Sequence, residues 1–186
     1  MFFLIFIIAI LLRNRSNFIS TTPKLKAIAK LESQVTISND DKNTRIKKMS
    51  NYHLNSGGKR LRALLTLGSA KLAGYDSFGK RDVSLSACVE LIHSATLLHD
   101  DVIDESDLRR GIKTTNALWG NQSSILVGDY LLSRCFEIMV DDGDLEILKL
   151  LSSTSAKIAQ GEVLQLQHKG EVDMLEETYF KIITAK

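Results

Sequence analysis

ELIHSATLLHDDVIDESDLRRG, residues 90–111, is the stretch of this 186-residue chain from which its architecture follows. In and just before it, apolar residues recur at steps of three and four, at Ala87, Cys88, Leu91, Ile92, Ala95, Leu98 and Val102. That spacing predicts a long helix over residues 83–104 with one apolar face. The polar sequence Arg109-Arg110-Gly111 is expected to close this helix.

Further helices are predicted on both sides of this segment. Ser56-Gly57-Gly58 marks a turn, and the leucine spacing after it predicts a helix that ends near Gly74. Downstream, helices are expected over about 123–140, 145–169 and 173–186. Residues 14–55 are polar and basic, with helix-like spacing only at Leu25, Ile28, Leu31 and Val35. No segment alternates convincingly between apolar and polar residues, so we expect an all-α fold without a sheet.

The composition is that of a globular, helical chain. Its 44% apolar content excludes intrinsic disorder, and its only proline is Pro23. Cys88 and Cys135 lack CxxC or histidine spacing, which predicts buried, reduced thiols rather than a disulfide or a structural zinc site. We therefore expect a soluble, cytoplasmic protein.

Charge is distributed unevenly along the chain. Residues 13–62 hold 12 Lys or Arg and 3 Asp or Glu, whereas the remainder holds 12 basic and 19 acidic residues. A basic front half favours an anionic partner such as phosphate, nucleic acid or a membrane surface, and an acidic second half suits divalent cations. Both regions are equally compatible with solvated helix faces.

The first 13 residues are treated as a separate apolar extension, MFFLIFIIAILLR. A helix that spans a membrane needs about 20 apolar residues, and a signal peptide needs a preceding positive charge and a cleavage site, so neither fits. Three interpretations remain: weak association with a membrane surface, a helix buried against a partner, or an extension of little structural meaning. Residues 14–186 are expected to form the helical domain.

Two clusters carry chemistry. Asp100 and Asp104 are four residues apart, so on a helix they share one face and repel unless a cation such as Mg²⁺ lies between them. His93 lies two turns before Asp100 on the same stripe. In the second cluster, Gly57-Gly58 precedes Lys59 and Arg62, which are spaced to share one phosphate group. Taken singly, the clusters also fit a solvated acidic helix end, a core histidine and a basic helix cap.

Together the clusters resemble trans-type polyprenyl diphosphate synthases, above all the long-chain members of that family. The matching stretches are SGGKRLR (56–62), residues 90–111, GNQSSILVGDYL (120–131) and AQGEVLQL (159–166), and the resemblance covers roughly 50–186. It implies an isoprenoid-synthase-type helical bundle. The family's second aspartate-rich motif has no counterpart here, so we expect an N-terminal portion, with a bundle incomplete at its C-terminus.

The resemblance also implies roles for individual residues. Asp100, Asp101 and Asp104 would bind Mg²⁺ bridged to an allylic diphosphate, which Arg109 would also contact. Isopentenyl diphosphate would be held by Lys59, Arg62, His93 and Arg110. Lys186 matches the lysine that opens the family's KTA segment, and Ala63 stands where the family usually has proline. The small side chains of Ala95 and Thr96 imply a long product.

The implied function is a prenyltransferase that condenses isopentenyl diphosphate with an allylic diphosphate, in isoprenoid or quinone side-chain biosynthesis. We expect no nucleic-acid partner. The chain would act as a homodimer or with a complementing C-terminal half, and be weak or inactive alone. The alternatives are a non-catalytic or regulatory subunit, against which an intact DDxxD argues, and a degenerate fragment that acts only as a helical interaction domain.

Other prominent residues are expected to be structural. Residues 141–144 are predicted to form a turn rather than a calcium loop. Trp119, Leu131, Leu132 and Phe136 are assigned to the core. His53 and His168 are expected at the surface, and His99 is expected to lack a ligand-like neighbour beyond the aspartates.

Overall fold

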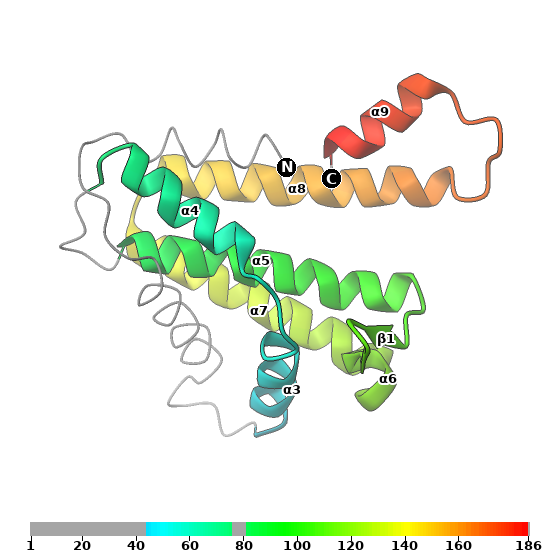
Figure 1. Cartoon of the computed structure of the whole chain (residues 1–186), viewed down its shortest axis with the longest axis horizontal. Helices are drawn as coiled ribbons and strands as arrows, with labels where there is room; N and C mark the ends of the chain where they lie inside the picture. The colour runs from blue at the N-terminus through cyan, green and yellow to red at the C-terminus, as the bar shows by residue number, and fades with distance from the viewer. Residues whose placement is uncertain (1–43, 76–80, 186) are drawn as a thin grey trace.

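A computed structural model describes residues 44–75 and 81–185. In those residues the chain forms seven helices and one small hairpin (Figure 1). The elements are α3 (Thr44–Leu54), α4 (Leu61–Leu72), α5 (Arg81–Ile103), β1 (Leu108–Arg109), β2 (Ile112–Lys113), α6 (Thr115–Trp119), α7 (Asn121–Asp142), α8 (Leu145–Gln167) and α9 (Glu176–Ala185). The apolar extension, the helix-like spacing at 25–35 and Lys186 lie outside the described residues.

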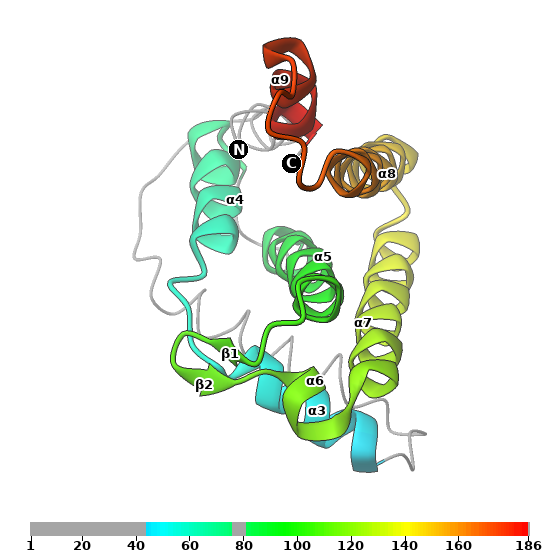
Figure 2. The ribbon, with the colours of Figure 1, turned by 90° about the vertical axis from the view of Figure 1, so that its right-hand side faces the viewer.

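Helix α5 is the centre of the bundle. Figure 2 shows it between α4 and α7, and its side chains are buried on nearly every face from Leu85 to Ala95. Leu91, Leu98 and Leu131 are fully enclosed in the core between α5 and α7. The helix predicted over residues 83–104 is therefore confirmed as α5, which begins two residues earlier and ends one residue earlier.

The two cysteines confirm the prediction of buried, reduced thiols. Both are free and fully buried, and they face each other from α5 and α7. The Cys88 thiol donates to the carbonyl oxygen of Cys135 at 3.7 Å, and the Cys135 thiol donates to that of Cys88 at 3.6 Å. The hydrogen bond with Cys135, and then burial, raise the pKa of Cys88, so its sulfur acts as a packing group.

The segment after α5 differs from the prediction. The helix ends at Ile103, so Arg109-Arg110-Gly111 does not close it: Arg109 ends β1, and Arg110 and Gly111 form the turn of an antiparallel hairpin with Leu108 opposite Lys113. Arg110 has a positive φ of 54° and Gly111 of 80°, as a tight hairpin turn requires. The expectation of no sheet was wrong because strands of two residues are too short to produce an alternating pattern.

The turn predicted over residues 141–144 is confined to Gly143 and Asp144, between α7 and α8, because Asp141 and Asp142 still belong to α7. Arg81, at the start of α5, binds Asp142 through Nε at 2.7 Å and Nη2 at 2.9 Å, and Asp144 through Nη2 at 2.7 Å. The other carboxylate oxygen of Asp144 accepts the backbone N–H groups of Glu146 and Ile147, and so caps α8. One arginine thus ties the first turn of α5 to the first turn of α8.

Beyond this turn, α8 and α9 form an arm with few core residues. Only Ile147 and Leu151 of α8 belong to the described core cluster. Helix α9 folds back on α8, where Gly161 permits a close approach: an added Cβ would lie 2.7 Å from that of Ala185.

Among the residues assigned to the core from the sequence, Leu131 is buried, and Trp119 and Leu132 are partly buried. The assignment of Phe136 was wrong, because this side chain is 41% exposed. None of the described helices combines the length and apolar character that crossing a bilayer requires.

Candidate functional site

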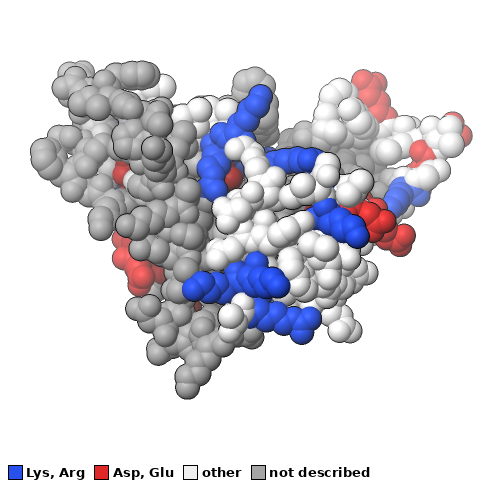
Figure 3. Space-filling model, turned by 60° about the horizontal axis from the view of Figure 1, so that its bottom comes forward, with Lys and Arg blue, Asp and Glu red and all other residues white. Residues whose placement is uncertain are grey.

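A cavity of about 800 Å³ opens between the end of α3, the start of α4, the middle of α5 and the hairpin. Five Lys or Arg residues line it, and Glu90 is the one carboxylate among its described lining residues; the cations are Lys59, Arg60, Arg62, Arg109 and Arg110. Figure 3 shows Lys and Arg spread over the described part of one face, with most Asp and Glu toward its edges. The excess of positive charge makes the cavity a site for an anion.

One wall of the cavity is the glycine loop between α3 and α4. Gly57 has φ of +90° and Gly58 of +151°, and a Cβ at Gly58 would lie 2.6 Å from Nη1 of Arg110. Glycine is favoured at position 58 by its positive φ, and its missing Cβ lets the Arg110 guanidinium lie against the loop backbone. Arg60, in the left-handed conformation with φ of 45°, donates to the Leu54 carbonyl at 3.4 Å. The loop thus brings cations of two separate segments together.

Glu90 fixes the start of α4. Its Oε1 accepts the backbone N–H of Ala63 at 3.0 Å, within the first helical turn. Burial lowers the pKa of Arg60, and the negative charge of Glu90 partly offsets that effect. Proline, which the resemblance places at position 63, has no N–H to donate, so this bond depends on the alanine.

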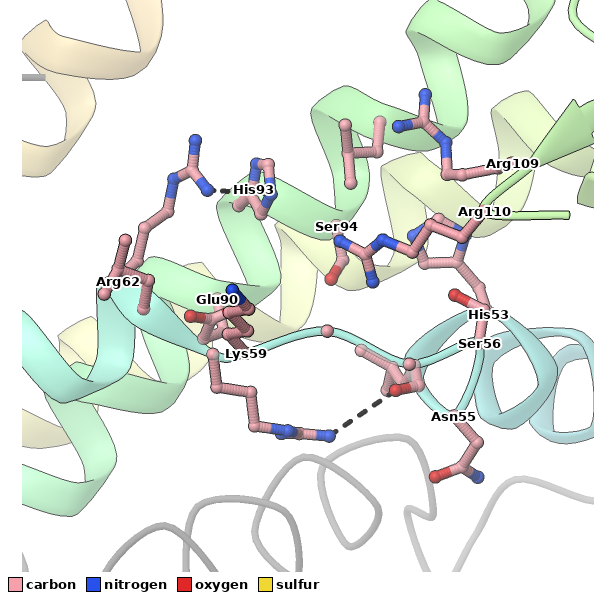
Figure 4. A pocket seen from close by; sticks show the side chains of 16 residues that line it. His53, Asn55, Ser56, Lys59, Arg62, Glu90, His93, Ser94, Arg109 and Arg110 are labelled. Carbon is pink, nitrogen blue, oxygen red and sulfur yellow. Dashed lines mark hydrogen bonds between the residues drawn. The ribbon is translucent and has the colours of Figure 1, made fainter.

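Arg62 and His93 form a pair across α4 and α5 (Figure 4). Arg62 Nη1 lies 3.0 Å from His93 Nε2. Burial, and then the charge of Arg62, lower the pKa of His93 to about 4, so the ring is neutral at pH 7. Because arginine only donates, Nε2 is the acceptor and the ring proton is assigned to Nδ1.

The neighbouring aspartates have different environments. The Asp101 side chain is 2% exposed and holds Arg109, with Nε at 3.0 and 3.1 Å from its two oxygens and Nη2 at 2.6 Å from Oδ1. Asp100 is half-buried, and Asp104 is exposed just past the end of α5, where its N–H donates to the Asp100 carbonyl. Among the described residues no three His, Cys, Asp or Glu side chains converge as ligands. Asp100 and Asp104 still fit Mg²⁺, which takes one or two carboxylates and completes its shell with water and phosphate oxygens.

The hairpin is anchored to α3 by Tyr52. The Tyr52 hydroxyl donates to the Lys113 carbonyl at 2.7 Å, and its ring packs edge-on against Trp119 with centroids 5.1 Å apart. Helix α3 therefore holds the hairpin at one point and leads into the glycine loop at its end. This helix was hard to predict from the sequence, because its turns are polar and only Met49 among its apolar residues is buried.

Two histidines contradict the sequence expectations. His53, expected at the surface, is 7% exposed and lines the cavity, because α3 turns it inward. His99 does have a carboxylate neighbour: its Nε2 lies 3.3 Å from Asp129 Oδ1 and 3.3 Å from the Ile125 carbonyl. The ring lies over Gly128 of α7. The two partners of His99, Asp129 and Ile125, could not be found from the sequence, because both lie on α7, about 30 residues further along the chain.

Of the remaining predicted site residues, Lys59, Arg62, His93, Arg109 and Arg110 all line the cavity. Ala95 is buried and Thr96 half-buried, one turn before Asp100 on α5, and neither belongs to the described lining. The hydroxyl of Thr96 donates to the His93 carbonyl at 2.8 Å. Their role in product length stays a prediction.

Comparison with known proteins gives consistent matches. The family model for polyprenyl synthetase matches residues 43–186. Octaprenyl diphosphate synthase of Escherichia coli is 44% identical over 141 residues, which is 76% of this chain and 43% of the relative. Heptaprenyl diphosphate synthase component 2 of Geobacillus stearothermophilus is 38% identical over 133 residues, 72% of this chain and 41% of the relative.

Solved structures agree. A decaprenyl diphosphate synthase from Rhodobacter capsulatus superposes with a TM-score of 0.83 at 44% identity, over 89% of this chain and 50% of that one. A polyprenyl synthase from Caulobacter crescentus, complexed with calcium and isoprenyl diphosphate, gives 0.79 at 36% identity, over 98% and 51%. The chain spans less than half the length of the two relatives above and about half of these solved chains.

Proposed function

Because the chain belongs to the polyprenyl synthetase family, we propose that it forms the first half of a prenyltransferase site, which joins isopentenyl diphosphate to an allylic diphosphate. The observation that supports this most strongly is the cavity with five cations beside α5, the helix that also carries Asp100. A pocket of this kind suits two substrates whose charge resides in diphosphate groups. The product would be a long trans-polyprenyl diphosphate.

The roles divide between the two ends of the site. Lys59, Arg62 and Arg110 would hold the diphosphate of isopentenyl diphosphate, with His93 keeping Arg62 in place through their 3.0 Å contact. Arg109, fixed by Asp101, would face the allylic diphosphate. A bidentate pair holds a guanidinium in one orientation, so less side-chain entropy is lost when the substrate arrives.

Asp100 and Asp104 would hold Mg²⁺, and we assign Asp101 to the positioning of Arg109. When bound, Mg²⁺ neutralises charge on the allylic diphosphate and makes it a better leaving group. The divalent ion in the Caulobacter crescentus complex supports a metal-dependent family chemistry. The small Ala95 and Thr96 would leave room for a growing chain, and Lys186 would contact a diphosphate, as the resemblance implies.

The reaction needs no protein nucleophile. The allylic C–O bond breaks and its electron pair leaves with the diphosphate. The double bond of isopentenyl diphosphate then attacks the carbocation, and a proton is lost. The residues of this chain would bind both diphosphates, orient them and stabilise the departing charge, which is the largest contribution such a site can make.

The opposite wall of the site would come from a C-terminal half, either continuous with this sequence or on a second chain. Coverage of less than half of the two relatives supports this arrangement. A relative named as component 2 of a synthase supports the variant with separate chains. Alone, the chain would bind diphosphate and turn over weakly or not at all.

The test is incorporation of labelled isopentenyl diphosphate into extractable lipid, with farnesyl diphosphate and Mg²⁺. The chain is assayed alone and with the C-terminal half of the Escherichia coli octaprenyl diphosphate synthase. We expect incorporation in the mixture, lost in Asp100→Asn and kept in Asp107→Asn, a matched exposed aspartate in the same acidic stretch. No incorporation by either sample, or incorporation that Asp100→Asn leaves intact, would reject the proposal.

A further inference from the structure

His53 occupies a position in the cavity that none of the roles above uses. It lies in the last turn of α3, and 93% of the residue is enclosed, since only 7% is exposed. It nevertheless lines the cavity, and Figure 4 shows its ring beside the Arg110 side chain, on the hairpin side of the pocket. The ring is therefore buried in the protein and turned toward the space that an anion would enter.

The His53 ring has no protein partner within the part of the chain that the structure describes. No hydrogen bond or ion pair joins either ring nitrogen to another group, whereas His93, His99 and His168 each have one. Nor is either nitrogen among the fully enclosed polar atoms without a partner. The ring is thus buried, yet it belongs to a residue that lines the cavity.

The electrostatic surroundings keep this ring neutral. Burial is the main cause that lowers the pKa of His53 to about 4; Asp101 acts in the opposite direction, and Arg109 and Arg110 lower it further. A neutral imidazole has one N–H donor and one acceptor nitrogen. The surrounding arginines can only donate, so they do not occupy the N–H of the neutral ring, which remains available to an incoming oxygen.

We propose that His53 is a further contact residue for the diphosphate in this cavity, in addition to Lys59, Arg62 and Arg110. It would donate one hydrogen bond to a phosphate oxygen between the glycine loop and the hairpin. This inference rests on the proposed function, because it concerns the same pocket. A buried polar side chain without a protein partner costs free energy of folding, and ligand binding would explain its presence.

The experiment is calorimetric titration of the full chain with inorganic pyrophosphate in the presence of EDTA, combined with thermal unfolding of each unliganded variant. His53→Leu removes both ring nitrogens at similar volume. His53→Asn and His53→Gln restore an amide N–H near the positions of Nδ1 and Nε2. Lys59→Ala reports on the pocket itself, and His168→Leu is the matched control, a histidine on the loop that follows α8.

We expect His53→Leu to weaken pyrophosphate binding roughly 10-fold or more, the range for a hydrogen bond to a charged group. Its Tm should equal or exceed that of the wild type, because an unpartnered polar group has been removed. One of the two amide variants should recover most of the affinity, and His168→Leu should bind like the wild type.

Three other results would overturn the inference. If the wild type binds pyrophosphate and Lys59→Ala weakens binding, but His53→Leu binds as tightly as the wild type, His53 is not a contact and the proposed function stands. The same holds if His53→Leu, Asn and Gln all lower Tm and affinity together, which indicates a packing role. If the folded wild type does not bind pyrophosphate at all, the proposed diphosphate pocket fails, and this inference fails with it.

Discussion

At the scale of single residues, the three aspartates of the DDxxD cluster differ more than their spacing suggests. Asp101 is enclosed and holds Arg109 through both carboxylate oxygens, while Asp104 is exposed past the end of the helix. Adjacent residues on a helix point in directions about 100° apart, so Asp101 faces the hairpin while the half-buried Asp100 points in a different direction. The motif therefore combines a structural ion pair with the two carboxylates that we assign to Mg²⁺.

Replacing Asp101 by Asn should destabilise the fold much more than replacing Asp100 by Asn. The first change leaves the Arg109 guanidinium without its charged partner, which costs about 3 kcal/mol for a largely buried pair. Asp100→Asn should cost less than about 1 kcal/mol, because Asp100 is only half-buried. Urea unfolding of the two variants checks this. Equal losses of unfolding free energy would show that the Asp101–Arg109 pair contributes no special stability.

His53 predicts a dependence of stability on pH. The folded pKa of about 4 lies below the ordinary 6.5, so the unfolded chain binds a proton first as the pH falls. Stability therefore decreases between about pH 6.5 and pH 4. Relative to His53→Leu, the wild type should lose about 2 kcal/mol of unfolding free energy from pH 7 to pH 5. Urea titrations at both pH values measure this, and parallel losses in the two proteins would contradict it.

The residues of the cavity illustrate what the sequence could predict at this scale. Lys59, Arg62, His93, Arg109 and Arg110 were all identified, because they belong to two dense local motifs. His53 and the His99–Asp129 contact were not, because a histidine's burial and partner depend on which distant element packs over it. Local spacing contains no such information.

At the scale of elements, α5 and α7 touch closely where His99 crosses Gly128. A Cβ on Gly128 would lie 2.4 Å from His99 Nε2 and 2.7 Å from its Cδ2. The glycine is thus required by a neighbouring ring and not by its own backbone, which is helical. By contrast, a Cβ on Gly68 of α4 would meet nothing within 4 Å.

The same glycine-to-alanine change should therefore have opposite effects at these two positions. Gly68→Ala should stabilise the protein by up to about 1 kcal/mol, the gain in helix propensity. Gly128→Ala should destabilise it by about 1–2 kcal/mol, because His99 must move away from Asp129. In a His99→Ala background, Gly128→Ala should become stabilising. Chemical denaturation of the four variants tests this, and an unchanged sign in the His99→Ala background would refute the contact.

The elements themselves were predictable where they are long. Helices α4, α5, α7 and α8 were placed within a few residues, since each buries an apolar stripe at helical spacing. Helix α3 and the hairpin were missed. The stability of α3 comes from contacts such as that of Tyr52 with Lys113, and the hairpin strands have two residues each. Tertiary contacts, not local pattern, determine such short elements.

At the scale of the whole molecule, the arm formed by α8 and α9 is weakly joined to the bundle. Only the first two turns of α8 reach the core, and large apolar side chains are exposed along the arm at Val163, Leu166, Leu175, Tyr179, Phe180 and Ile183. Such a surface suits the proposed C-terminal half. It also means that stability is distributed unevenly over the chain.

Hydrogen exchange should reveal this uneven stability. We expect amides of α9 and of the second half of α8 to exchange well before those of α5 and α7, by at least a factor of ten. Mass spectrometry of peptic fragments gives the comparison directly. Adding the complementing C-terminal half should slow exchange in the arm and leave α5 unchanged. Protection in the arm equal to that of α5 would contradict the expectation.

The bond between Tyr52 and Lys113 has a kinetic consequence. It joins residues 61 positions apart, whereas Arg62 and His93 are separated by 31 and Ala63 and Glu90 by 27. Closing the larger loop costs roughly 0.6 kcal/mol more, and the hairpin must already exist. We therefore expect the hairpin to join α3 late in refolding, after the helices have paired. Trp119, the single tryptophan, packs on Tyr52 and so reports on this contact. During refolding its fluorescence should therefore change more slowly than the circular dichroism of the helices. A common rate for both signals would indicate that the cavity forms in one step with the bundle.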